Sequence, residues 1–259
     1  MRLDIKGLNY DYSKDVRVLR DIDLSMESPE LVCVIGPNGV GKSTLIKCIN
    51  RLLESNEGSI TIDGRSIKDM SRKELAMIVG YVPPATTDMF SIPVLDAIMV
   101  GRHNLQRWRN TEDDVQKVYA LMELMGIEDL AMRNFNRLSS GQHQKVSIAR
   151  GLAMETPILL LDEPTSNLDV KYQVYVAEML RGIAREKNML IVMISHDLNI
   201  AAKYADKIVV MKEPGTVHAY GKPIDVVTRE MVREVYDVDC TVQIIDGVPN
   251  VVLGFVLSR

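Results

Sequence analysis

The segment Gly36-Pro37-Asn38-Gly39-Val40-Gly41-Lys42-Ser43-Thr44 decides the fold of this chain. It follows the apolar run 31–35 (LVCVI) and opens a stretch with helical periodicity. Glycines allow such a loop to curl, so that its backbone N–H groups and the start of the helix point at phosphate oxygens. The segment fits the pattern G-x-x-x-x-G-K-[ST], in which Lys42 binds the β- and γ-phosphates and the Ser43 hydroxyl binds Mg²⁺. A glycine turn that only joins strand to helix is the alternative, and the flanking strand and helix argue against it.

Short apolar runs alternate with helical patterns along the chain. They lie at residues 31–35, 158–161, 190–194 and 208–211. Such runs are typical of buried strands in a mostly parallel sheet, so we expect an α/β core. The first thirty residues and the segment 58–63 (GSITID) alternate like partly exposed strands and predict an antiparallel sheet beside that core. After Lys42 we expect one helical apolar stripe, formed by Leu45, Ile46, Ile49, Leu52 and Leu53.

Helical periodicity also predicts a subdomain inserted into the core, at about residues 91–155. Its clearest apolar face comprises Val115, Val118, Leu121, Met122 and Met125. Residues 1–221 would then form one domain, and residues 222–259 a small C-terminal lobe containing a helix and two strands around Asp246-Gly247. The simplest interpretation of this lobe is a cap over the last edge of the sheet.

Two further runs end in residues suited to phosphate chemistry. Asp162-Glu163 follows the run 158–161, at the strand end where open α/β sheets place ligands. Asp162 would position Mg²⁺, and Glu163 would act as general base toward the attacking water. His196 follows the run 190–194, and it would orient the γ-phosphate and the water. In isolation, an exposed acidic turn and a structural histidine are the simpler interpretations.

Four motifs occur in the order and spacing of ABC (ATP-binding cassette) ATPases, and the chain resembles this family over about residues 1–225. They are GPNGVGKST at 36–44, LSSGQ at 138–142, ILLLDEPTSNLD at 158–169 and the histidine of SHD at 195–197. The resemblance implies a P-loop NTPase core with an antiparallel β subdomain and an inserted helical subdomain. It also implies hydrolysis of ATP with Mg²⁺, in a homodimer that encloses two ATP molecules.

The resemblance assigns roles to further residues. The signature Ser139-Ser140-Gly141-Gln142 of one subunit would close over the γ-phosphate held by the other, although on its own it is typical of a helix start capped by a serine. Asp169 would belong to the loop through which the two sites communicate. Tyr12 would stack on adenine, unless it is an ordinary surface tyrosine.

Two positions depart from the family pattern. Pro84 stands where the family usually has a glutamine that senses Mg²⁺ and the attacking water, and proline has no side-chain donor or acceptor. Hydrolysis or its coupling is therefore expected to differ. Ser140 replaces a commoner glycine in the signature, a change we expect to be compatible with activity because Gly141 is retained.

A second resemblance, to the ATPases of iron-siderophore, haem and cobalamin importers, narrows the expected function. It rests on Val94-Leu95-Asp96, Val100-Gly101-Arg102, His103, HDLNIAAKYADKIVVMKEPG at 196–215 and GKPIDVVTREMVREVY at 221–236. It implies a membrane permease and an extracytoplasmic substrate-binding protein as partners. The basic stretch 102–109 would contact the permease or form a solvated basic face. The rival classes are an ATPase of an iron–sulfur assembly scaffold and an ABC ATPase of nucleic-acid maintenance or translation.

Composition and charge restrict the partners and the compartment. The net charge is −4, from 31 basic and 35 acidic residues, so no nucleic-acid partner is expected. The three cysteines show no metal-binding spacing and are expected to be reduced thiols. No signal-like start is apparent, and no apolar stretch approaches the roughly 18 residues of a membrane span. We therefore expect a cytoplasmic protein that attaches to the inner face of the membrane through a separate partner.

Overall fold

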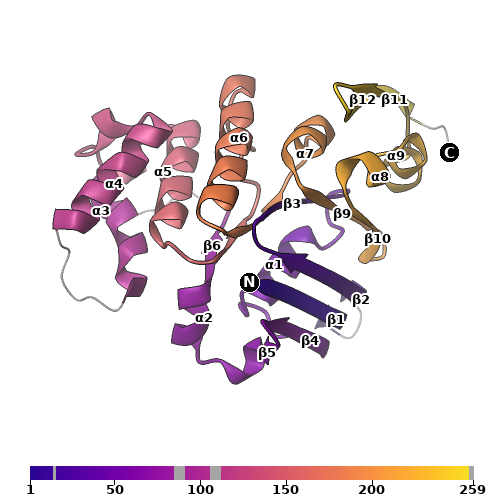
Figure 1. Ribbon diagram of the computed structural model, residues 1–259, viewed down its shortest axis with the longest axis horizontal. Coiled ribbons are helices and arrows are strands. Elements are labelled where there is room, and N and C mark those ends of the chain that lie inside the picture. Colours follow the sequence, from indigo (N-terminus) through magenta and orange to yellow (C-terminus); the bar gives the residue numbers. More distant parts are fainter. Residues whose placement is uncertain (14–15, 85–90, 106–111, 257–259) are drawn as a thin grey trace.

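The computed structural model describes residues 1–13, 16–84, 91–105 and 112–256. Its centre is a six-stranded sheet in the order β10-β9-β3-β8-β7-β6, which is parallel except for β10 at one edge (Figure 1). The strands are β3 Glu30–Ile35, β6 Val79–Val82, β7 Ile158–Leu161, β8 Leu190–Ile194, β9 Lys207–Lys212 and β10 Thr216–Gly221. The four predicted core runs are all strands of this sheet, because short apolar stretches between turns can be buried on both faces.

A second, antiparallel sheet in the order β2-β1-β4-β5 packs beside this core, as predicted. Its strands are β1 Arg2–Ser13, β2 Val16–Glu27, β4 Glu57–Ile62 and β5 Arg65–Ser66. The alternation of β3 divides the hydrophobic core in two. Val32 and Val34 pack with β1, β2, β4 and helix α1 (Lys42–Ile49), whereas Leu31 and Cys33 pack with the helices of the opposite face.

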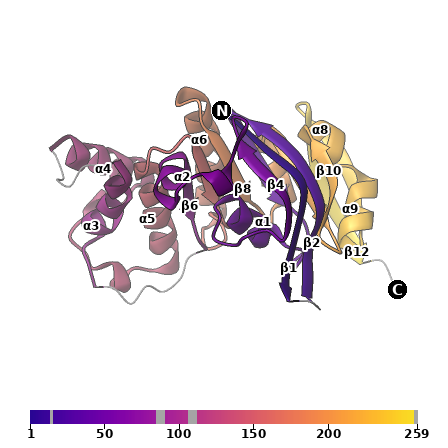
Figure 2. The same cartoon turned by 90° about the horizontal axis from the view of Figure 1, so that it is seen from below.

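The remaining helices cover the parallel sheet and extend it at one end. They are α2 Arg72–Ile78, α3 Val94–Met99, α4 Glu112–Met125, α5 Ser140–Ala153, α6 Val170–Glu186 and α7 Leu198–Tyr204, with short 3₁₀ turns at Ile67–Asp69, Val100–Leu105, Glu128–Leu130 and Phe135–Arg137. Helices α3, α4 and α5 pack on one another and lie at the end opposite the C-terminal elements in both views (Figures 1 and 2). Among the helices in the described part of the chain, none is long and apolar enough to cross a membrane. The two sheets and the helices packed on them confirm the predicted α/β fold.

The C-terminal elements are two short helices followed by a β-hairpin. They are α8 Pro223–Val226, α9 Arg229–Tyr236, β11 Val238–Ile245 and β12 Val248–Val256. The hairpin pairs only with itself in the described chain and packs on α7, while α8 packs on β9 and β10. The Asn199 side chain joins α7 to β12, because its amide donates to the Val251 carbonyl at 3.2 Å and accepts from the Val251 N–H at 2.7 Å.

The predicted apolar stripe after Lys42 is wrong at its far end. Helix α1 ends at Ile49, and Leu52 lies beyond it with 59% of its surface exposed. Arg51 adopts a left-handed conformation with φ of 54°, and its guanidinium donates to the carbonyls of Ile67 and Met70. Contacts to a distant segment therefore terminate the helix before its apolar pattern ends.

The interpretation of stretch 102–109 as a solvated or permease-facing basic segment is wrong for Arg102. This side chain is buried, and its guanidinium contacts Asp114 at 2.9 Å and Glu155 at 2.8 Å. A buried cation requires such partners, since its desolvation is costly. Residues 106–109 lie outside the described part of the chain.

Candidate functional site

The glycine-rich loop joins β3 to α1, and its backbone conformation requires glycine at positions that include Gly36 and Gly41. A side chain at Gly36, whose φ is 147°, would collide with the Met211 carbonyl, and Gly41 caps α1 with φ of 101°. Among the residues that the structure describes, no side chain caps the start of α1. Because the first N–H groups of a helix have no partner within the helix, this arrangement offers an anion site suited to phosphate oxygens.

Lys42 lies inside this loop with only 5% of its surface exposed. Its ammonium donates to the carbonyls of Gly36 and Pro37, both at 2.7 Å. Burial lowers the pKa of Lys42, and the nearby carboxylates of Glu163 and Asp162 oppose that shift. The Lys42 ammonium is therefore held within the loop by two carbonyl acceptors, which phosphate oxygens can replace.

Asp162, at the end of β7, is buried and faces the start of α1. The Ser43 hydroxyl donates to its Oδ1 at 2.9 Å, and the Tyr81 hydroxyl donates to its Oδ2 at 3.4 Å. Burial is the main cause that raises the pKa of Asp162; the hydrogen bond from Ser43 opposes it, and the Glu163 carboxylate adds to it.

The neighbouring oxygens of Ser43 and Asp162 fit Mg²⁺, which prefers one or two protein oxygens and completes its shell with water and phosphate oxygens. Within the described ranges, no group of three or more His, Cys, Asp and Glu side chains could hold a metal ion, so a dedicated all-protein cage is not found there. Any Mg²⁺ at this point would depend on the nucleotide for the rest of its ligands.

Glu163 and His196 meet at the carboxyl ends of β7 and β8, which are neighbours in the sheet. The Glu163 Oε1 and the His196 Nε2 lie 2.7 Å apart, with 31% and 43% of the side chains exposed. A carboxylate that lies against an imidazole and is still open to solvent can accept a proton from a bound water. The structure thus brings these two predicted residues together.

The turn after Glu163 is held by two helices that sequence reasoning did not connect with it. Gln144 of α5 donates to the Glu163 carbonyl at 3.3 Å, and Gln173 of α6 donates to the Thr165 carbonyl at 3.2 Å. Asp169 caps α6 by accepting from the Tyr172 N–H at 3.0 Å. The signal for Gln144 was available, since it is a polar residue within the apolar face of its predicted helix.

The signature residues begin α5. Ser139 and Gln142 form a capping box, Ser140 is exposed, and Gly141 packs so closely that an added Cβ would lie 3.3 Å from the Asn167 carbonyl oxygen. Within the described chain, no hydrogen bond joins this segment to the glycine-rich loop of the same subunit. Ser139 and Ser140 at this helix start are exposed to solvent.

Tyr12 and Pro84 lie at the margins of the site. Tyr12 is the penultimate residue of β1, with 55% of its surface exposed. Its ring lies edge-on to Tyr10, and its hydroxyl is 3.4 Å from the Thr44 Oγ1. Pro84 is exposed two residues after β6, the strand whose Val82 carbonyl accepts from the Asp162 N–H at 2.9 Å. Both residues therefore border the segment that holds the phosphate-binding groups.

The C-terminal lobe contacts the glycine-rich loop through Tyr236. Burial raises the pKa of Tyr236, and a hydrogen bond donated by the Gly36 backbone N–H to the Tyr236 hydroxyl oxygen opposes that shift and links the lobe to the loop. This contact was not predicted from the sequence.

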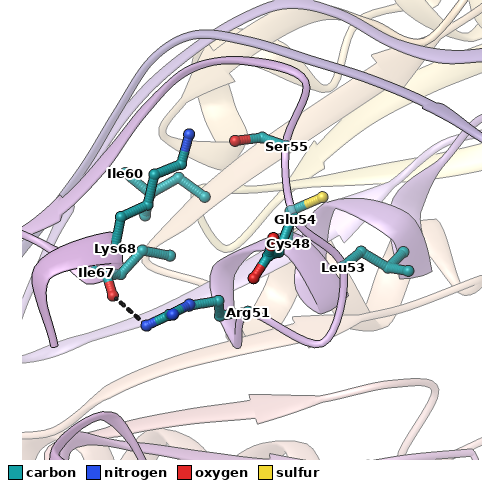
Figure 3. Close-up of a pocket in the computed structure, with 8 residues that line it drawn as sticks. All are labelled: Cys48, Arg51, Leu53, Glu54, Ser55, Ile60, Ile67 and Lys68. Atoms are coloured by element: carbon teal, nitrogen blue, oxygen red, sulfur yellow. Dashed lines mark hydrogen bonds between the residues drawn. The ribbon is translucent and has the colours of Figure 1, made fainter. Parts of the chain in front are cut away.

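A pocket of about 300 Å³ lies at the far end of α1, between that helix, β4 and the turn at Ile67–Asp69 (Figure 3). Its wall is formed by residues within 48–68, among them Arg51, Ile60 and Ile67, and is therefore separate from the phosphate-binding groups at 36–44 and 162–163.

The glycine-rich loop, the buried lysine and the acidic pair at the end of β7 define a P-loop nucleoside-triphosphatase. Residues 19–166 match the family model described as ABC transporter, and the chain belongs to this family of ATP-hydrolysing proteins.

Curated relatives extend the match to nearly the whole chain. An uncharacterized ABC transporter ATP-binding protein of Methanocaldococcus jannaschii is 39% identical over 97% of this chain and 98% of its own length. The ferric enterobactin transport ATP-binding protein FepC of Escherichia coli is 36% identical over 93% of this chain and 89% of its own length. A solved structure described as the inward-facing conformation of a metal-chelate type ABC transporter superposes with a TM-score of 0.82, at 25% identity, over 98% of this chain and 97% of that one.

Proposed function

We propose that this chain is the ATPase subunit of an importer for a metal-chelate cargo, of the iron-siderophore, haem or cobalamin type. The observation that carries the proposal is the similarity to import ATP-binding proteins over 93% of the chain, together with the likeness to a metal-chelate type transporter over 98% of it. The chain would attach to a membrane permease at the inner face of the membrane, and an extracytoplasmic binding protein would deliver the cargo. The two rival classes, a scaffold ATPase and a nucleic-acid maintenance ATPase, are not favoured by these relatives.

In the proposed reaction, the loop and Lys42 hold the β- and γ-phosphates, with the lysine exchanging its two carbonyl acceptors for phosphate oxygens. Ser43 and Asp162 would hold Mg²⁺, which neutralises phosphate charge when bound. Glu163 accepts the proton of the attacking water. His196 keeps the Glu163 carboxylate oriented and donates a hydrogen bond as charge develops on the γ-phosphate.

The complete site would need a second subunit. Ser139, Ser140 and Gly141 at the start of α5 would bind the γ-phosphate held by the partner's loop, since a helix N-terminus and a serine hydroxyl form an anion site. Asp169 lies at the start of α6, where it would face the partner, and the Tyr12 ring would stack on adenine. The accessible position of the signature supports this arrangement.

Reconstitution with the permease tests the importer assignment. The complex is placed in vesicles, and ATP hydrolysis is measured with binding proteins loaded with ferric siderophore, haem or cobalamin, each against its unloaded form. One loaded form should stimulate hydrolysis, and a complex carrying Glu163→Gln should show none. If no metal chelate stimulates hydrolysis, the cargo class is wrong, whereas the ATPase assignment stands.

A further inference from the structure

Gln144 is a polar side chain in the interior of the protein, three residues after the signature glycine Gly141. None of its surface is exposed. Its Nε2 donates to the backbone carbonyl of Glu163 at 3.3 Å, while its Oε1 is buried and has no hydrogen-bond partner among the described residues. A methionine or leucine would fill a similar volume without burying an unsatisfied acceptor. The single hydrogen bond to Glu163 is therefore the evident contribution of this amide.

The backbone that Gln144 contacts has an uncommon conformation. Glu163 has φ of 55°, in the left-handed region that non-glycine residues seldom adopt, so neighbouring contacts must hold it. The Ser166 hydroxyl donates to the same carbonyl at 3.1 Å. A rotation of this peptide would move the Glu163 carboxylate away from the His196 Nε2, which lies 2.7 Å from it.

We propose that Gln144 is a positioning residue for ATP hydrolysis: its amide ties helix α5 to the backbone of Glu163 and so fixes the carboxylate that activates water. This inference rests on the proposed function, in which Glu163 is the base and the signature binds the partner's ATP. Helix α5 begins at the signature, which would bind the ATP held by the partner subunit. The hydrogen bond from Gln144 would therefore connect that signature with Glu163, the base for the ATP held by the same subunit.

The first test is Gln144→Met, which keeps the length of the side chain and removes the donor. We expect kcat to fall about tenfold, the effect of losing one hydrogen bond, while KM for MgATP is unchanged because the phosphate-binding groups are intact. Ile148→Val, at another fully buried position of α5, is the matched control and should retain kcat. If the two variants lose kcat in proportion to their loss of stability, Gln144 only packs the core and the proposal is wrong.

Gln144→Glu adds a readout that a packing role would not move. A protonated carboxyl can donate to the Glu163 carbonyl, whereas an ionised one cannot. The ratio of its kcat to that of the wild-type protein should therefore fall as the pH rises. A ratio that stays constant from pH 6 to pH 9 would contradict the proposal, even if the methionine variant failed to fold.

Mixed dimers identify the site on which Gln144 acts. One subunit carries Glu163→Gln, so only its partner can hydrolyse ATP. Placing Gln144→Met in the subunit that retains Glu163 should reduce the rate about tenfold, and placing it in the other subunit should not. The opposite pattern would show an effect through the signature and overturn the proposal. If Glu163→Gln alone keeps wild-type hydrolysis, the proposed role of Glu163 fails as well, which separates the two failures.

Discussion

Asp162 combines a suitable position for Mg²⁺ binding with an unfavourable position for a charge. Its folded-state pKa is raised, chiefly because burial disfavours the ionised form. The folded protein therefore holds this proton more tightly than the unfolded chain does, and the carboxylate costs stability as the pH rises through the folded-state pKa. Sites that bind charged ligands commonly retain such a cost.

We expect Asp162→Asn to raise the free energy of unfolding at pH 7.5 by about 1 kcal/mol, typical of a single stabilising substitution, while ATPase activity is lost. The gain should shrink as the pH falls through the folded-state pKa and vanish below the unfolded value of 3.8, where both states bind the proton. Urea unfolding at pH 7.5 and pH 3.5 measures both. A less stable variant at pH 7.5 would show that the hydrogen bonds from Ser43 and Tyr81 outweigh the cost of burial.

Pro84 gives a second prediction at the scale of one residue. Pro84→Gln should keep the ATPase rate or raise it up to about tenfold, because an amide two residues after β6 adds at most one positioned hydrogen bond. Pro84→Ala is the control, since it removes the ring without adding an amide. A large loss in the glutamine variant alone would mean that the segment has been rebuilt around proline.

At the scale of elements, strands were the most predictable part of the molecule. The runs at 158–161 and 190–194 are strands with those bounds, because apolar residues between turn residues suit a sheet buried on both faces. The end of α1 was mispredicted, since it depends on contacts between Arg51 and a segment beyond β4. The site residues Lys42, Asp162, Glu163 and His196 could be found from motifs, whereas the supports Gln144 and Gln173 depend on how α5 and α6 pack on the turn.

Arg102, in the 3₁₀ turn after α3, forms a buried ion pair with Asp114 of α4 and donates to the Ala153 carbonyl at the end of α5. This ion pair should therefore stabilise the packing of these helices. Asp114→Ala should lower the free energy of unfolding by about 3 kcal/mol, because it leaves a buried guanidinium with only part of its compensation. Asp113→Ala, at the preceding position, is the matched control. Its partner Lys117 lies 3.2 Å away at the surface, so the loss should stay below about 0.5 kcal/mol. Equal losses in urea unfolding would contradict a structural role for the buried pair.

At the scale of the whole molecule, segments far apart in sequence supply one reaction. The ends of β3, β7 and β8 bring together the loop, the acidic pair and the histidine, while the serines at the start of α5 are exposed. In the proposed dimer, one chain would therefore carry two incomplete halves of an ATP site.

Glu163→Gln should consequently accumulate as a dimer in MgATP, because ATP bound between subunits is no longer hydrolysed. Light scattering should give twice the monomer mass with ATP and the monomer mass without it. Adding Lys42→Ala to the variant should restore the monomer, since the lysine that holds the phosphates is gone. A variant that stays monomeric in saturating MgATP would contradict the shared site.

The buried cysteines allow the association of the two subunits to be followed in solution with dyes. All three are buried, and burial raises their thiol pKa, for Cys48 to about 12. The thiolate is the form that attacks a maleimide, so the native thiols will react slowly. A single cysteine introduced on the surface will then be the one that accepts a dye. Fluorescence energy transfer between donor- and acceptor-labelled subunits can thus report dimer closure in an otherwise native sequence.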